Sequence, residues 1–205
     1  MGELPMFPLG TVLLPGGLLP LHVFEERYRT MVRRCLDGDR QFGVVLIERG
    51  SEVGGGDVRT DVGTVAQIAE ASETPDGRWA VLAVGVGRIR VLEWLPDDPY
   101  PRADVLLWDD PPPGEGFAEH VSAAMTLLRQ VVALKAELGD AVAAVPDELA
   151  GDPLLASYQA CWLAPVPTID KQRLLASETP EERMTLLERL LGEEAEVLEI
   201  RLRGG

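Results

Sequence analysis

The chain has 205 residues, of which 46% are hydrophobic and 26% charged, and its formal net charge is −15. This composition is typical of a globular protein, and the length suits one compound domain or two small lobes. The excess of acid disfavours binding to nucleic acid, which depends on Lys and Arg neutralising phosphates, and to anionic membrane surfaces. Prolines interrupt every apolar run near the N-terminus, so we expect no secretory leader, no membrane span and a cytoplasmic location.

Residues 1–110 are predicted to form a β lobe. Short apolar runs separated by turns predict seven strands, at residues 6–7, 12–14, 19–23, 42–47, 62–68, 79–94 and 103–107. Pro20 indicates an edge or bulged strand, and Gly85 and Gly87 indicate a bulge or bend in the longest strand. Strands and helices do not alternate regularly. We therefore expect an α+β fold whose first lobe is a small mixed or antiparallel, PUA-like pseudo-barrel.

One helix is predicted inside this lobe, from Phe24 to Leu36. Its apolar residues recur at helical spacing and define the face expected to be buried: Phe24, Tyr28, Met31, Val32, Cys35 and Leu36. Cys35 and Cys161 are the only cysteines, and both fall on apolar helix positions. We therefore expect two buried, reduced thiols rather than a disulfide.

Residues 111–205 are predicted to form a helical bundle. The proline-rich segment 111–114 marks the boundary, and beyond it the apolar period changes to that of a helix. Helices are expected at residues 117–138, 153–162, 168–175 and from residue 180 onward. Asp152, Thr168 and Thr179 are the expected N-caps of the last three. Short loops between such helices favour a compact bundle.

Four motifs in this order resemble those of stand-alone Lon-domain proteins. The segment Leu19–Val32 is similar to the family pattern "LPL-x-(I/V)-F-E-x-R-Y-x-x-M", and residues 63–66 to its "GT-x-A" strand. Residues 87–91 resemble the "G-x-x-R-(F/V)" strand, and residues 170–187 resemble the carboxyl-terminal "KQ-x-LLE…R…LL" segment. The resemblance covers nearly the whole chain and implies a pseudo-barrel lobe joined to a helical bundle.

The resemblance also implies a role in recognising unfolded or client polypeptides, as an adaptor or holdase, with a protease or chaperone as a further partner. The ATPase and the Ser–Lys peptidase of Lon have no counterpart in these 205 residues, so we expect binding without catalysis.

Residue patterns for catalysis or cofactor binding are missing from the sequence. There is no phosphate-binding loop, no nucleophile elbow and no His-Glu-x-x-His motif, and the glycine-rich segment 51–56 has acidic neighbours. We therefore expect no catalytic residues, no metal site and no cofactor. An uncharacterised hydrolase and a PUA-like nucleic-acid-binding protein remain alternative hypotheses.

Candidate binding residues are those expected to expose apolar surface or to border it. Leu13, Leu14, Pro15 and Leu18 are predicted to flank the Gly16-Gly17 turn as an exposed apolar loop pair, beside a sheet edge that could accept an extended peptide. His22 is expected on the surface, with Glu26 and Arg27 as a polar rim. Of the four tryptophans, most are expected in the core, with Trp108 the most exposed.

Overall fold

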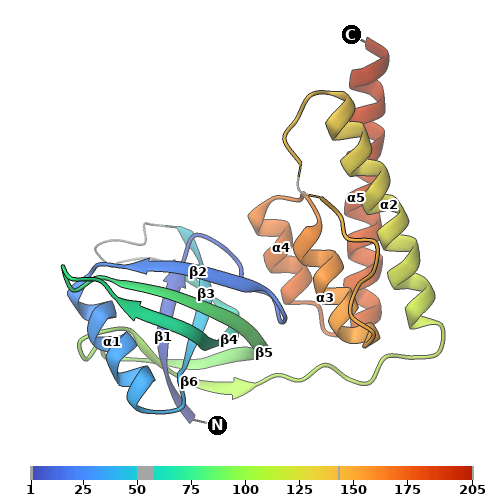
Figure 1. Ribbon diagram of the computed structural model, residues 1–205. Helices are drawn as coiled ribbons and strands as arrows, with labels where there is room; N and C mark the ends of the chain where they lie inside the picture. The colour runs from blue at the N-terminus through green and yellow to red at the C-terminus, as the bar shows by residue number, and fades with distance from the viewer. Residues whose placement is uncertain (1, 50–57, 143, 205) are drawn as a thin grey trace. The chain divides into compact units, whose positions relative to one another are not determined.

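The computed structural model describes residues 2–49, 58–142 and 144–204, and the chain forms two compact units, Met1–Asp109 and Asp110–Gly205 (Figure 1). Asp110 therefore belongs to the second unit, whereas the sequence placed it at the end of the first. The glycine-rich segment 51–56 lies outside the described residues.

The first unit contains six strands in one mixed sheet and one helix. The elements are β1 (Gly2–Leu9), β2 (Leu18–Val23), α1 (Glu26–Asp37), β3 (Gln41–Arg49), β4 (Val58–Glu73), β5 (Trp79–Leu95) and β6 (Arg102–Leu107). The strand order is β2-β5-β4-β3-β1-β6, and β5 also pairs with β6. These pairings close a ring of β5, β4, β3, β1 and β6, to which β2 is added as an edge strand. Likeness to a PUA-like barrel stays a prediction.

A bulge in β5 decides which of its residues face which core. Val65 pairs with Gly87, whereas the next residue of β4, Ala66, pairs with Gly85, so Val86 is the extra residue. Because neighbouring residues of β4 face opposite sides of the sheet, Gly85 and Gly87 also face opposite sides. The bulge was predicted. As a consequence of the bulge, the odd-numbered residues from Val81 to Val91 do not all share one face.

Each face of the sheet consequently has its own apolar core. One core takes residues from every strand of the ring: Met6, Val45, Val65, Ile89, Ala103 and Val105. The other contains the buried face of α1, where Tyr28 stacks on Phe7 with ring centroids 4.1 Å apart, together with Val81 and Ala83 of β5. Because Val86 is an extra residue in β5, the side chains before it and after it that would otherwise share a face point to different cores.

Two sequence predictions for the first unit are wrong. Residues 12–14 form no strand but a buried connection between β1 and β2. Phe24 is 59% exposed and precedes α1, which begins at Glu26 with Glu25 as an extended N-cap residue. Two non-helical residues, Phe24 and the extended Glu25, separate Val23 from α1, so Phe24 does not continue the helix face that Tyr28 and Met31 bury.

The second unit contains four helices: α2 (Phe117–Glu137), α3 (Pro153–Leu163), α4 (Thr168–Leu175) and α5 (Pro180–Gly204). α2 runs beside α5 in the same direction, and Lys135 pairs with Glu194 at 2.5 Å while His120 lies 3.4 Å from Glu188 (Figure 1). The buried residues of this pair include Leu128, Val131, Leu187 and Leu191. None of the helices in the described parts of the chain is long and apolar enough to cross a membrane.

Helix starts in this unit follow the sequence signals with one exception. The Asp152 carboxylate accepts a hydrogen bond from the Leu155 N–H at 2.8 Å, and the Thr179 hydroxyl accepts one from the Glu182 N–H at 3.1 Å. The predicted Thr168 cap is wrong, because Pro167 is the N-cap and Thr168 is already helical. Pro167 has no side chain that could accept a hydrogen bond, so α4 begins without a side-chain cap.

Candidate functional site

The edge strand β2 has an outward-facing row of exposed residues. Residues alternate along β2, so that Leu19 and Val23 are buried while Leu18, Pro20 and His22 are exposed. Leu18 has 56% of its surface exposed. The strand order places β2 at the edge of the sheet, as Pro20 predicted, since a residue without an N–H is tolerated in a sheet chiefly at an edge.

The neighbouring strand β5 adds a second apolar row to the same face. Leu18 pairs with Val84, Pro20 with Leu82 and His22 with Ala80, and directly paired residues share a face of the sheet. Ala80, Leu82 and Val84 are half-buried. We call the resulting surface the outer β2–β5 face: Leu18, Pro20, His22, Ala80, Leu82 and Val84.

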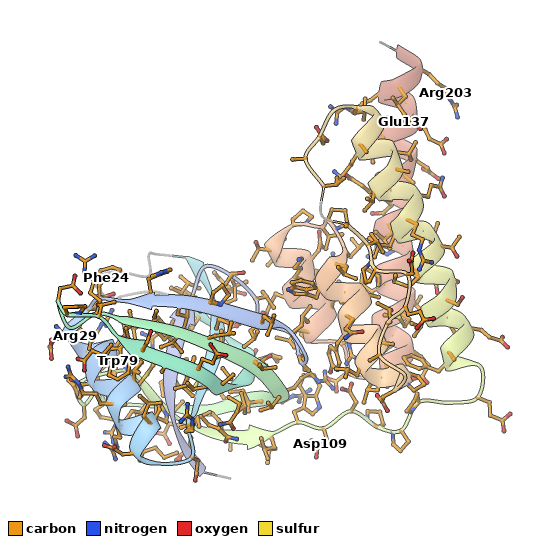
Figure 2. The ribbon with its side chains drawn as sticks, in the orientation of Figure 1. Phe24, Arg29, Trp79, Asp109, Glu137 and Arg203 are labelled. Atoms are coloured by element: carbon orange, nitrogen blue, oxygen red, sulfur yellow. The ribbon has the colours of Figure 1, made fainter. Side chains whose placement is uncertain are left out.

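Two further apolar side chains stand at the ends of this face. The bulged Val86 is 53% exposed and lies beyond Leu18, and the 59% exposed Phe24 follows the other end of β2. Figure 2 shows Phe24 at the same end of the unit as Arg29 and Trp79. The outer β2–β5 face with these two residues is an aliphatic and aromatic strip that includes one titratable side chain, His22.

The predicted loop pair 13–15 does not contribute to this strip. Leu13, Leu14 and Pro15 are buried, and only Leu18 of the predicted apolar group is exposed. Thr64 donates a hydrogen bond to the Leu13 carbonyl at 2.6 Å, which fixes the loop against β4. The expectation that Leu13, Leu14 and Pro15 lie on the surface is therefore wrong, because the turn folds inward over the sheet.

The turn instead positions the start of β2. The Gly16 N–H donates to the Gly85 carbonyl at 2.8 Å, and the Gly85 N–H donates to the Gly17 carbonyl at 2.9 Å. A Cβ on Gly85 would collide with the Leu14 carbonyl oxygen, so only glycine allows this close approach. These contacts continue the β2–β5 ladder past Leu18 and hold its side chain on the outer face.

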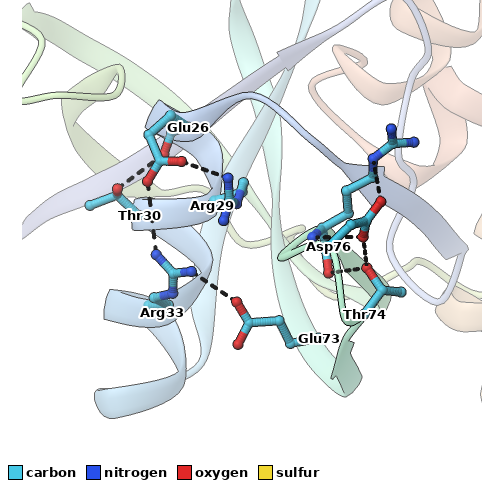
Figure 3. A network of polar contacts seen from close by, with 8 residues as sticks. Glu26, Arg29, Thr30, Arg33, Glu73, Thr74 and Asp76 are labelled. Atoms are coloured by element: carbon cyan, nitrogen blue, oxygen red, sulfur yellow. Dashed lines mark hydrogen bonds and ion pairs between the residues drawn. The ribbon is translucent and has the colours of Figure 1, made fainter.

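Charged residues occupy the exposed side of α1 and the β4–β5 hairpin (Figure 3). Glu26 accepts a hydrogen bond from Arg29 at 2.7 Å and lies 3.9 Å from Arg33, which also donates to Glu73 at 2.8 Å. The hydrogen bond from Thr74 lowers the pKa of Asp76, which also pairs with Arg78. These ion pairs tie α1 to the hairpin and form a polar border near Phe24.

The other predicted site residues take different places. His22 is exposed, as expected, and Glu26 belongs to the charged network. Arg27 pairs with Glu25 at 3.1 Å and lies over the Tyr28 ring, 4.6 Å from its centroid. Trp108 is half-buried between two guanidinium groups, at 3.9 Å from Arg88 and 3.8 Å from Arg90. Whether any of these residues contacts a ligand stays a prediction.

Tryptophan burial differs from the prediction. None of the four lies in the fully buried core: Trp79, Trp94 and Trp108 are half-buried and Trp162 is 47% exposed. Leu82, Val84 and Phe24 also reach the surface, which the sequence pattern did not predict. No local pattern in the sequence shows whether another element covers Leu82 and Val84.

Both cysteines are free and buried, as predicted. Burial raises the pKa of the Cys35 thiol to about 11 and that of Cys161 to about 12. Neither is a reactive thiolate at neutral pH. Within residues 2–49, 58–142 and 144–204, no group of three or more His, Cys, Asp or Glu side chains is arranged to hold a metal ion.

The fold is that of an α+β protein with a mixed six-stranded sheet followed by helices, and solved structures share it. Residues 3–193 match the family described as the ATP-dependent protease La (LON) substrate-binding domain, and the chain belongs to this family.

Individual relatives agree with this assignment. The chain is 30% identical to Lon protease 2 of Herpetosiphon aurantiacus and 29% identical to Lon protease 2 of Myxococcus xanthus, over 97% and 96% of its length. It spans 24% of the length of each of these curated relatives.

Among solved structures, a Lon N-terminal domain protein from Xanthomonas campestris is 27% identical with a TM-score of 0.64, covering 91% of this chain and 97% of that one. The N-terminal domain of a Mycobacterium avium complex Lon protease superposes with a TM-score of 0.63 over 93% of this chain and 98% of that one. At 14% identity, the second likeness concerns the fold alone.

Proposed function

We propose that this protein binds exposed apolar segments of polypeptides on the outer β2–β5 face, as an adaptor or holdase without chemistry of its own. Membership of a substrate-binding family supports the polypeptide as the ligand class. The observation that carries the proposal is the pairing of two outward apolar rows, Leu18 and Pro20 on β2 with Val84 and Leu82 on β5. An exposed strip of this kind is typical of an interaction surface.

The edge position of β2 suits an extended ligand. A polypeptide strand laid along the free edge of β2 gains main-chain hydrogen bonds from Leu18 and His22, while its alternate side chains reach the aliphatic strip. Pro20 supplies no N–H at this edge, which limits open-ended pairing between copies of the sheet. We therefore expect only a few residues of a ligand strand to pair with the edge of β2.

Charge contributes to the choice of ligand. The chain carries a net charge of −15, so polypeptides with basic residues beside their apolar segment are favoured and acidic ones are disfavoured. The same charge disfavours RNA, the ligand of the alternative PUA-like hypothesis. An anisotropy titration with labelled RNA at low salt separates the two functions, and RNA binding there would contradict the present proposal.

The direct test measures binding of a fluorescein-labelled peptide rich in Leu and Phe, with an equally long peptide in which Ser replaces them. The variant Leu18→Asp/Val86→Asp changes two side chains that are more than half exposed. We expect it to weaken binding of the apolar peptide about tenfold or more. Ile200→Asp on α5, at a residue 68% exposed, is the matched control and should bind like the wild type. Equal affinity of both variants would refute the outer β2–β5 face as the site.

A further inference from the structure

A groove of about 540 Å³ lies in the second unit, whereas the outer β2–β5 face belongs to the first. It is formed by the end of α2, the chain after α2, the end of α3 and the start of α4. Its apolar walls are Val132, Ala141, Val142, Leu163, Ala164 and Pro165, and Trp162 lies at its side with 47% of its surface exposed. The volume lies within the usual range of small-ligand sites, about 300–1,000 Å³.

Both lysines of the chain, Lys135 and Lys171, line this groove. Every other basic side chain apart from the two histidines is an arginine, and acids outnumber Lys and Arg by 34 to 19. Two ammonium groups beside one apolar groove are therefore unusual in this chain. Asp140 is the one carboxylate among the lining residues.

The two ammonium groups have different hydrogen-bond partners. Lys135 pairs with Glu194 at 2.5 Å. Lys171 donates to the Trp162 carbonyl at 2.9 Å, and the described residues offer its ammonium no carboxylate partner. Partial burial lowers the pKa of Lys171, as expected for a cation that has lost water without gaining an anion.

We propose that this groove binds a carboxylate carried on an apolar body. The carboxylate accepts hydrogen bonds from the remaining N–H groups of Lys171, and the apolar body lies against Trp162 and the aliphatic walls. A charge-assisted hydrogen bond in a partly dry site is stronger than one between neutral groups, so the anion decides the affinity. Two sources have this chemistry: a small apolar acid, and the C-terminal carboxylate of a polypeptide that ends in an apolar residue.

The test compares acids with their amides on the full chain. The small probes are 3-phenylpropionate and 3-phenylpropanamide, and the peptide probes are acetyl-Leu-Leu-Phe and the same peptide with a C-terminal amide. The readout is the indole N–H signal of Trp162 in a ¹H–¹⁵N spectrum, assigned with Trp162→Phe. We expect at least one acid to shift this signal with an affinity about tenfold above that of its amide.

Substitutions identify the ammonium responsible. Lys171→Gln should abolish the preference for the acid, whereas Arg173→Gln should retain it, because Arg173 lies on the same helix, pairs with Asp170 at 2.9 Å and does not line the groove. Melting curves by circular dichroism verify that both variants fold. A shift by the small acid assigns a small-molecule ligand, and a shift by the peptide acid alone assigns a polypeptide C-terminus.

Three results would overturn the proposal: no shift of the Trp162 signal by either acid, equal affinities for acid and amide, or an unchanged preference in Lys171→Gln. None of them bears on peptide binding at Leu18 and Val86, which lie in the other unit. Failure of this site and failure of the proposed function are therefore distinguishable.

Discussion

Arg183 of α5 donates a hydrogen bond to the carboxylate of Asp110, and both side chains are buried, at 0% and 5% exposure. Tyr158 of α3 donates to the other carboxylate oxygen, and its ring lies 3.9 Å beneath the guanidinium. Arg183 also donates to the Leu174 carbonyl at 3.3 Å. One buried cation thus joins the chain before α2 to the middle of α3, the end of α4 and the start of α5.

Arg183→Met should destabilise the second unit by about 3–5 kcal/mol, because it leaves the Asp110 carboxylate buried without its cation. Adding Asp110→Leu should recover part of the loss. Urea unfolding followed by helical circular dichroism measures both effects. Arg189→Met is the control on the same helix. It breaks only an exposed pair with Glu193 at 2.7 Å and should cost at most about 0.5 kcal/mol. A similar cost for both arginines would contradict the assigned role of Arg183.

Two buried tyrosines should respond differently to removal of their hydroxyl groups. Tyr158→Phe removes a hydrogen bond to a carboxylate and should cost about 1.5–3 kcal/mol. The Tyr100 hydroxyl has no hydrogen-bond partner among the described residues, although the side chain is only 1% exposed. Tyr100→Phe should therefore change the free energy of unfolding by less than about 0.5 kcal/mol or raise it. A loss of stability in Tyr100→Phe would indicate an ordered water on that hydroxyl.

The two glycines beside the bulge in β5 should differ in how well they tolerate substitution by alanine. In Gly85→Ala the new Cβ meets the Leu14 carbonyl oxygen, and it lies 3.1 Å from Thr64 Cγ2, so the turn before β2 must move. We expect a loss of about 1–3 kcal/mol. Gly87→Ala meets no atom within 4 Å and should be neutral or slightly stabilising. Thermal unfolding of the two variants measures the difference, and equal melting temperatures would contradict the packing described for Leu14.

Alkaline pH should weaken the fold through its two thiols. The folded-state pKa values of Cys35 and Cys161, about 11 and 12, lie above the ordinary value of 9.0. Their contribution to stability is therefore complete below pH 9 and is lost as the pH rises toward 11 or 12. Cys161→Ala should reduce the fall in the free energy of unfolding across that range.

The same thiols should also resist alkylation. Iodoacetamide at about pH 8 should modify neither cysteine in the folded protein and both in urea, as read by mass spectrometry, because the buried groups stay protonated. Rapid labelling of Cys161 without denaturant would show that the helical unit opens at that position.

Local signals in the sequence were sufficient for most elements. The helical spacing of Tyr28, Met31 and Cys35 predicted the buried face of α1, and the Asp152 cap predicted the start of α3. Pro20 marked the edge strand because a missing N–H has the same consequence in any fold. Phe24 was placed incorrectly, because its helical spacing from Tyr28 does not show that the chain is still extended there.

The proposed binding surface could be predicted only in part for a related reason. His22 was recognised from alternation and Leu18 as part of an apolar loop, whereas Leu14 and Pro15 of the same loop were expected outside and are buried. A run of Leu and Pro has the same composition in an exposed loop and in a loop folded onto a sheet. The contact between Leu14 and Gly85, distant in sequence, decides between them.

The sequence by itself determined most of the strands and helices, where most helices start and to which family the chain belongs, since capping, periodicity and motifs act over a few neighbouring residues. Only the tertiary structure decided that β5 changes from one core to the other at Val86, that Val84 and Leu82 of β5 pair with the outer residues of β2, and that the two lysines line one groove. These features depend on pairing and packing between residues far apart in the chain, and no local pattern records them.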